Sequence, residues 1–349
     1  MAVPFTLAPA HLARFWRPTT VALDMGSDAF RLAVASTRSL LEIPARAVVD
    51  RRGNIVALGK RALLMAERLP DGCQNIPPME MGHLCHPQAA GLLVRVLLRQ
   101  LQRRRLWKPR LRVAVPVGMT PMERTVLQGF LHDLPVRDVE FGPGAVSQCL
   151  GAGLDPADAP GRLVLDIGAQ RTVATVLSFG QPVSVEIWPV GGDSWTLALR
   201  GAVEDTYRVR VPLIVVEQWK RAGGDGRLPV QDRLCGHMTT LELPAAFAAA
   251  AMEEATLRLL EFITALFTRA APTLRMDLQQ QGILLVGHGG LLPGLSARFE
   301  AELGLAIHVP ADPGRCLVRG LARFRLGSPR ADKEAVPRDA PVDLYPLEA

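Results

Sequence analysis

Two short apolar runs in this chain end in the same way, with an aspartate followed two positions later by a glycine. Residues 20–23 lead into Asp24-Met-Gly-Ser, and residues 163–165 lead into Asp166-Ile-Gly-Ala. A second β-rich run follows each turn, at 30–35 and at 172–179. This pattern predicts two similar β-hairpins, each with an aspartate at the end of its first strand. We therefore interpret the chain as an internally duplicated α/β protein.

Helix-type periodicity occupies residues 89–106, 121–131 and 244–271, and short aliphatic runs at 112–117 and 282–286 are typical of buried strands. An apolar fraction of 48% and a charged fraction of 21% provide ample material for a core. The length of 349 residues suits two domains or one large two-lobed fold. Residues 327–349 are rich in proline and charge, so we predict a disordered tail there.

The five cysteines are scattered, which favours reduced thiols over a disulfide framework. The N-terminal residues lack the pattern of a secretory signal, and no run approaches about 18 uninterrupted apolar residues. These features predict a cytoplasmic protein. His83, Cys85 and His86, with Cys73 upstream, match no standard zinc spacing. We also find no local signature of a nucleophile with its base, so we assign no catalytic residue.

A third glycine-rich segment, Gly287-His-Gly-Gly290, follows the apolar run at 282–286. An aspartate at a strand end is suited to ordering the water shell of Mg²⁺, and a glycine turn lets backbone N–H groups approach phosphate oxygens. Two such turns, combined with the third segment, predict a three-part nucleotide cleft. The alternative interpretation is that all three segments are ordinary tight turns.

With these motifs in place, the chain resembles the MreB family of bacterial actins over residues 20–324. Further similar stretches fall in the family's order and spacing, at 116–124, 151–154, 190–193, 217–220, 282–287, 291–295 and 312–320. The resemblance implies a duplicated actin-like (RNase H-like) α/β fold with two lobes around a nucleotide cleft. It places the first lobe at 20–155 with a small insertion at about 37–80, and the second at 156–326 with an insertion at about 200–245.

The resemblance also implies the roles of the cleft residues, with ATP or another nucleotide and Mg²⁺ as the expected ligands. The residues that would orient Mg²⁺ through water are Asp24 and Asp166. Those that would line the phosphates are Gly26, Ser27 and Gly168, and those expected near the adenine and ribose are Lys220, Gly287 and Gly289. Two further cleft residues depart from the family. Arg171, in the altered second loop, is expected to act as a phosphate donor, and His288 replaces a glycine beside the purine, where its side chain would either crowd the base or stack on it.

The sequence departs from the family in ways that predict slow hydrolysis. The first loop of the family continues with threonine, alanine, asparagine and threonine, whereas this chain has Ser27, Asp28, Ala29 and Phe30. The change removes polar ligands and adds a carboxylate beside the expected phosphates. Segment 141–145 lacks the family's glutamate that positions the hydrolytic water. Glu140 lies just upstream, where we expect a surface charge. At most, these residues predict a weak ATPase.

Two segments predict contact with a membrane surface. Leu12, Phe15 and Trp16 fall on one side of a short amphipathic segment within residues 1–19. Leu106 and Trp107 lie in the run 103–112, whose six basic residues and no acids equal the whole net charge of +6. The alternatives are a segment packed on its own domain and a solvated basic face. No nucleic-acid motif accompanies the run, so we expect no nucleic-acid partner.

Two functional hypotheses follow from the resemblance and the departures. In the first, the chain is a filament-forming cytoskeletal protein at the inner face of the plasma membrane, assembled head to tail with itself and working with cell-wall elongation or shape proteins. In the second, it is an actin-like adaptor that does not hydrolyse ATP and co-assembles with another filament or membrane complex. A phosphotransferase of the sugar-kinase type is a third class, but no catalytic aspartate for it is identifiable.

Overall fold

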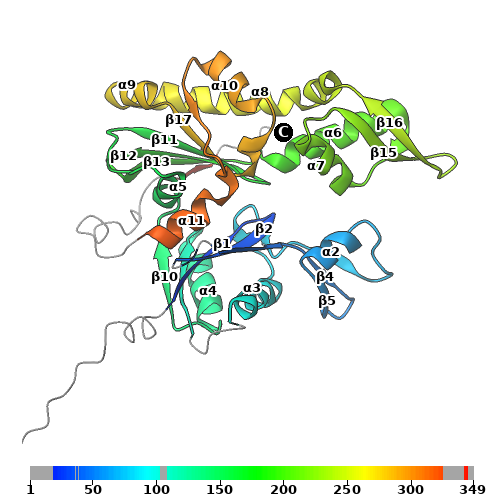
Figure 1. The fold of residues 1–349 in the computed structure, drawn as a ribbon, viewed down its shortest axis with the longest axis horizontal. Helices are drawn as coiled ribbons and strands as arrows, with labels where there is room; N and C mark the ends of the chain where they lie inside the picture. Colours follow the sequence, from blue (N-terminus) through cyan, green and yellow to red (C-terminus); the bar gives the residue numbers. More distant parts are fainter. Residues whose placement is uncertain (1–18, 36, 38, 103–107, 325–341, 345–349) are drawn as a thin grey trace, which may run out of the picture.

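The computed structural model describes residues 19–324, apart from 36, 38 and 103–107, and the backbone of 342–344. The described residues form two lobes, one above the other, and each lobe carries a smaller extension on the same side (Figure 1). The proposed membrane residues Leu12, Phe15, Trp16, Leu106 and Trp107 lie outside the described residues. None of the described helices combines the length and the apolar character needed to span a bilayer.

The first lobe is built on a five-stranded sheet in the order β10-β9-β1-β2-β3. Its strands are β1 (Thr20–Met25), β2 (Ala29–Val34), β3 (Leu40–Pro44), β9 (Arg110–Ala114) and β10 (Asp138–Gly142). The hairpin β1–β2 is antiparallel, as predicted, and β9 and β10 add in parallel. Helices α3 (Pro87–Gln102) and α4 (Pro121–His132) pack their apolar sides on one face of this sheet.

The second lobe repeats the same strand order, which confirms the internal duplication. Its sheet runs β18-β17-β11-β12-β13-β19. The repeated strands are β11 (Arg162–Ile167), β12 (Thr172–Ser178), β13 (Gln181–Trp188), β17 (Ile283–Val286) and β18 (Ile307–His308). One face is covered by α6 (Gly192–Tyr207), α8 (Ala245–Arg269), α9 (Pro272–Gln281) and α10 (Leu295–Leu303). The first strand of each predicted hairpin therefore ends at the equivalent edge of its own sheet.

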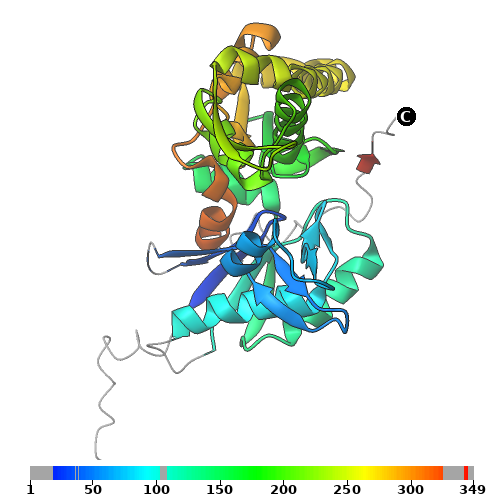
Figure 2. The same cartoon turned by 90° about the vertical axis from the view of Figure 1, so that its right-hand side faces the viewer.

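Helices α5 (Gly144–Ala152) and α11 (Cys316–Arg323) lie between the two sheets (Figures 1 and 2). Helix α11 packs Val318 and Leu321 on the first sheet, against Ala22 and Ala33. Helix α5 packs on the second sheet. The two helices cross at glycines: a Cβ on Gly320 would lie 1.5 Å from the carbonyl oxygen of Ser147. Their backbones therefore touch, and this contact fixes how the lobes meet.

Each lobe contains an inserted small sheet. The first insertion has β4 (Ala47–Val49), β5 (Ile55–Leu58), β6 (Gln74–Ile76) and α2 (Lys60–Met65), and the hairpin β7 (Met79–Glu80) and β8 (His83–Leu84) follows it. The second has β14 (Val209–Arg210), β15 (Gly226–Asp232), β16 (Met238–Leu243) and α7 (Leu213–Arg221). These two extensions form the right-hand side of the molecule in Figure 1.

A short strand, β19 (Val342–Leu344), pairs in parallel with β13. It falls in the segment 327–349 that the sequence predicts as a disordered tail, so the structure differs from the prediction at these three residues. The physical reason is that β13 would otherwise be an edge strand, whose backbone N–H and C=O groups are open to pairing.

The register of β9 and β10 changes the interpretation of the basic run. Arg110 lies opposite Asp138, and Arg112 lies opposite Glu140. Glu140 forms ion pairs with Arg110 at 2.9 Å and with Arg112 at 2.8 Å, and its side chain is only 16% exposed. Glu140 is therefore not the surface charge that we expected, because the parallel strands bring these cross-strand pairs together. Two of the six basic residues at 103–112, Arg110 and Arg112, thus form ion pairs with acids of the neighbouring strand β10.

Candidate functional site

A cleft with a cavity volume of about 710 Å³ lies between the lobes, within the size range of small-molecule sites. Segments far apart in the sequence meet there, at the ends of β1, β11 and β17. All ten cleft residues predicted from the sequence line it: Asp24, Gly26, Ser27, Asp166, Gly168, Arg171, Lys220, Gly287, His288 and Gly289. The structure thus brings the three separate motifs together.

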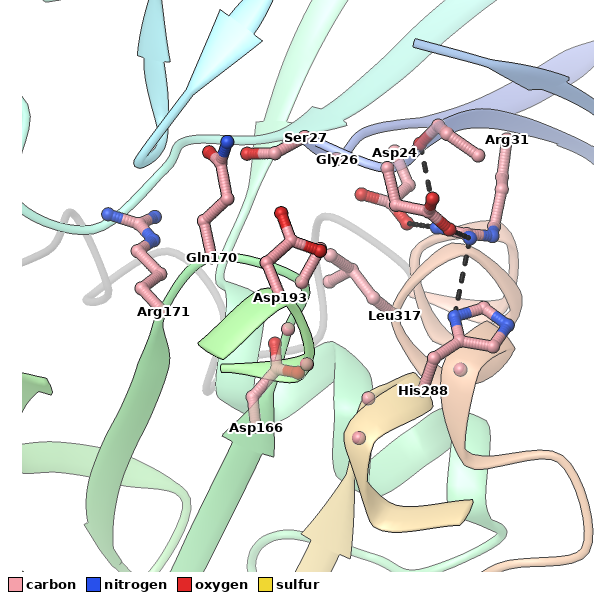
Figure 3. Close-up of a pocket in the computed structure, with 18 of the residues that line it drawn as sticks. Asp24, Gly26, Ser27, Arg31, Asp166, Gln170, Arg171, Asp193, His288 and Leu317 are labelled. Atoms are coloured by element: carbon pink, nitrogen blue, oxygen red, sulfur yellow. Dashed lines mark hydrogen bonds and ion pairs between the residues drawn. The ribbon is translucent and has the colours of Figure 1, made fainter. Parts of the chain in front are cut away.

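Asp24 meets a cation of its own hairpin. Arg31 on β2 lies directly opposite Asp24 on β1, and its Nη1 is 3.4 Å from the Asp24 Oδ2 (Figure 3). Burial raises the pKa of Asp24, and the Arg31 guanidinium opposes that rise. Although burial works against the charged guanidinium, Asp24, Glu42 and Asp28 together hold the pKa of Arg31 above its usual value. Arg31 therefore remains a cation in the cleft.

The second aspartate has a neutral partner. Gln148 on α5 donates from Nε2 to the Asp166 Oδ2 at 2.6 Å. Burial, with a smaller contribution from the Asp24 charge, raises the pKa of Asp166 to about 6. Asp166 lies opposite Val173 in its hairpin, so the second repeat has no cation at the place where the first has Arg31. The two aspartates are equivalent in the fold but not in their electrostatic surroundings.

The glycines of the two turns shape the backbone. The N–H of Gly26 donates to the carbonyl oxygen of Ala29, and the N–H of Gly168 donates to that of Arg171. These two N–H groups close their own turns. Gly287 has φ +82°, and a Cβ there would lie 2.4 Å from the Asp166 Oδ1. Glycine at 287 therefore allows the third motif to approach the second aspartate closely.

Arg171 bridges the lobes. Its Nη1 donates to the carbonyl oxygens of Met81 at 2.8 Å and Val117 at 3.0 Å, both in the first lobe. The neighbouring Gln170 accepts from the backbone N–H of Met81 at 2.7 Å. Arg171 lies on the opposite side of the cleft from the Arg31–His288 pair (Figure 3). The phosphate role predicted for Arg171 thus competes with two carbonyl partners.

Lys220 is buried, and its ammonium group is fully engaged by the second lobe. It donates to the carbonyl oxygen of Gly192 and to the Thr196 Oγ1, each at 2.7 Å, and pairs with Glu217 at 2.6 Å. These contacts tie α7 to the start of α6.

Asp193, in the first turn of α6, faces the cleft (Figure 3). Burial raises the pKa of Asp193, and the charge of Arg46 opposes that rise.

His288 contacts the first lobe across the cleft. Its Nδ1 lies 3.3 Å from the Arg31 Nη2, and its ring packs closely over Gly314. Burial, followed by the Arg31 charge, lowers the pKa of His288, so the neutral ring is favoured. A neutral Nδ1 accepts the hydrogen bond that Arg31 donates. The side chain at this position thus lines the cleft and is directed to Arg31.

Sequence reasoning missed several polar residues of the cleft, among them Arg31, Gln148 and Arg46. Arg31 interrupts the otherwise apolar strand Ala-Phe-Arg-Leu-Ala-Val, and Gln148 interrupts the apolar helix α5. A long polar side chain in such a run is a signal that could have found both, since burial of a polar group requires a partner. Arg46, which donates to the carbonyl oxygen of Ser27 at 2.8 Å, gave no such signal because it lies in a connecting segment.

Glycine turns, an aspartate from each repeat and several cations are suited to an anionic, nucleotide-like ligand. The expected Mg²⁺ fits this site less well than the nucleotide does, because Asp24 already faces the guanidinium of Arg31. No group of three or more metal-ligating side chains occurs among the residues that the structure describes. The duplicated sheets, the two insertions and the cleft between them define this chain as an actin-like protein.

The comparisons with known proteins narrow that class. The sequence model described as MreB/Mbl protein matches residues 18–330, so the chain belongs to the MreB/Mbl family, as the resemblance indicated. It is 25% identical to the cell shape-determining protein MreB of Escherichia coli (strain K12), over 86% of this chain and 91% of that protein.

Several solved structures share the fold. The crystal structure of MreB5 of Spiroplasma citri bound to ADP superposes with a TM-score of 0.82 at 20% identity, over 89% of this chain and 97% of that one. A structure described as the MamK double helical filament has a TM-score of 0.73 at 14% identity, over 88% and 98%. At such identities, these likenesses concern the fold alone.

Proposed function

We propose that this chain binds a nucleotide between its lobes, assembles head to tail into filaments and acts in cell-shape determination. One observation carries the proposal: three motifs separated by more than a hundred residues line a single cleft of suitable size. Membership of the MreB/Mbl family, and relatives named as cell shape-determining proteins, support the cellular role. Structural relatives bound to ADP and assembled as a filament support the ligand and the assembly.

Slow hydrolysis is part of the proposal. Gly144 lines the cleft at the start of α5, within the segment where the family supplies a glutamate. The nearby Glu140 is held by Arg110 and Arg112, outside the residues that line the cleft. Gln148 donates to Asp166 rather than presenting a free base. The segment 141–148 thus offers no carboxylate to activate water, and filament assembly would rest on nucleotide binding.

Filament formation by the purified chain tests the proposal. With ATP present, we expect the protein to pellet on ultracentrifugation and to form filaments visible by negative-stain electron microscopy. Phosphate release should be much slower than assembly. The absence of both pelleting and filaments, with ATP and with anionic vesicles added, would overturn the cytoskeletal role.

We also propose that the filament attaches to the inner face of the plasma membrane through Leu12, Phe15, Trp16, Leu106 and Trp107. Replacing both Leu106 and Trp107 with serine should release the protein from vesicles containing phosphatidylglycerol, because an interfacial tryptophan and leucine are lost. Co-sedimentation measures this directly. The matched control is Leu234→Ser, which removes a leucine that is 96% exposed between β15 and β16. Equal vesicle binding by wild type and the double variant would refute this attachment site.

The second candidate is an adaptor that joins another filament without hydrolysing ATP. The observation that favours it is the altered first loop, where Asp28 adds a carboxylate to the cleft near Arg31. The same pelleting assay separates the two roles: an adaptor would stay in the supernatant alone and enter the pellet only with a partner filament. Cell-wall elongation or shape proteins are the partners that we propose in either case.

A further inference from the structure

The charges around Arg31 form a balanced cluster that reaches across the cleft. Arg31 lies 3.4 Å from Asp24, 3.7 Å from Asp28 and 3.2 Å from Glu42, and its side chain is 5% exposed. Asp28 is also 3.9 Å from Arg221, and Glu42 is 3.4 Å from Arg315. Three carboxylates of the first lobe thus meet three guanidinium groups, two of which belong to the second lobe. Arg221 also pairs with Glu217 at 2.7 Å, and Arg315 also pairs with Asp312 at 3.3 Å. These two acids pair in turn with Lys220 and Arg319, so the whole network contains five carboxylates and five cations.

We infer that Arg31 supplies the positive charge beside Asp24 that a divalent cation would otherwise supply, so nucleotide binding in this cleft depends little on Mg²⁺. The inference rests on the proposed nucleotide-binding function and concerns the form in which the nucleotide binds. It departs from the sequence-based prediction that Asp24 and Asp166 together orient Mg²⁺.

The internal duplication provides the first argument. Asp24 and Asp166 occupy equivalent positions next to the end of their strands, and their cross-strand partners are Arg31 and Val173. A cross-strand pair shares one face of the sheet, so the register holds the guanidinium at Asp24. Arg31 is therefore built into the hairpin of the first repeat and does not reach the aspartate by a chance rotamer.

The balance of charge provides the second argument. Divalent metal ions bind where carboxylates outnumber nearby cations. At Asp24 the chain has already neutralised its acids, and a metal ion would meet the fixed charge of Arg31. A guanidinium with several N–H groups is also a strong ligand for phosphate oxygens.

An unused donor provides the third argument. Within the described part of the chain, the buried Nε of Arg31 has no hydrogen-bond partner. Buried N–H groups usually have one, so a shift of the guanidinium toward a phosphate oxygen would satisfy this donor. His288 accepts from the Nη2 of the same group at 3.3 Å, which leaves the guanidinium positioned from both lobes.

Isothermal titration calorimetry with ATP and ADP, in excess EDTA and in millimolar Mg²⁺, tests the inference on the full chain. We expect the wild-type dissociation constants in the two buffers to agree within threefold. Arg31→Leu should weaken binding in EDTA at least tenfold, and Mg²⁺ should restore part of the loss. Arg31→Lys, which keeps the charge but loses the guanidinium donors, should bind more weakly than wild type in EDTA and more tightly than Arg31→Leu. Arg298→Leu is the control for losing an ion-paired arginine, since Arg298 pairs with Glu253 and Glu302 away from the cleft.

A tenfold or greater loss of wild-type affinity in EDTA would overturn the inference and leave nucleotide binding intact. So would full wild-type affinity of Arg31→Leu in EDTA. If neither nucleotide binds the wild type in either buffer, the proposed function fails, and this inference fails with it. If Arg31→Leu does not fold, Glu42→Gln tests the role of the Arg31 charge, because it removes one of the carboxylates that pair with Arg31. Removing that carboxylate is expected to raise ATP affinity in EDTA at least threefold, and a decrease would count against the role of Arg31.

Discussion

Replacing Gly320 with alanine is expected to lower the free energy of unfolding by about 3 kcal/mol, the upper part of the usual range for overpacking. A Cβ on Gly320 would lie 1.5 Å from the Ser147 carbonyl oxygen, and one on Gly151 would lie 1.9 Å from that of Cys316. Both obstacles are backbone atoms, so no side chain can move aside to make room. Helices α5 and α11 would have to separate, and the two sheets that they join would move with them.

Urea denaturation followed by circular dichroism measures this effect. Gly201→Ala is the matched control, because Gly201 also lies within a helix, and a Cβ there would meet no atom within 4 Å. The control should gain stability, by up to about 1 kcal/mol, because alanine is the better helix former. If Gly320→Ala and Gly201→Ala unfold at the same urea concentration, the close crossing of α5 and α11 does not exist as described.

Asp166→Asn is expected to raise the stability of the protein at pH 7, by roughly 2–3 kcal/mol, while altering the cleft. Burial raises the pKa of Asp166 from 3.8 to about 6. The folded state therefore binds a proton more tightly than the unfolded state does. As pH rises from about 4 to about 6, the unfolded state releases this proton first, and stability falls. Above about pH 6 both states are ionised, and the penalty is constant.

Unfolding midpoints between pH 4 and pH 8 check the sign and the size of this effect. The wild type should lose stability over the lower part of that range, and Asp166→Asn should lose less. Asparagine keeps an oxygen to accept the hydrogen bond from Gln148, so the local geometry is retained. Asp158→Asn, at an exposed loop position, is the control and should change stability by no more than about 0.5 kcal/mol. Equal pH profiles for wild type and Asp166→Asn would contradict the raised pKa.

The hairpins were predictable because their signals are local. A short apolar run, an aspartate at the strand end and a glycine turn define β1–β2 and β11–β12 within short segments. The same local signals gave the three glycine-containing motifs of the cleft, since strands that end at one edge of a sheet bring their turns together. Lys220, on helix α7, was predicted only from the family resemblance. The prediction for Glu140 was wrong for the opposite reason. Its partners, Arg110 and Arg112, lie on β9, which is distant in the sequence, and only the parallel register of β9 and β10 pairs them.

By itself, the sequence determined that this protein is duplicated, that it has the MreB/Mbl pattern and which turns face a common cleft. The repeated motifs contain that information because backbone geometry at a strand end depends on nearby residues. Only the tertiary structure decided the charge at the cleft. The net charge of +6 says nothing about where cations lie. Cross-strand pairing sets Arg31 against Asp24, and the approach of the lobes brings Arg221 and Arg315 to Asp28 and Glu42. Electrostatic interactions depend on distance and burial, and folding alone sets both.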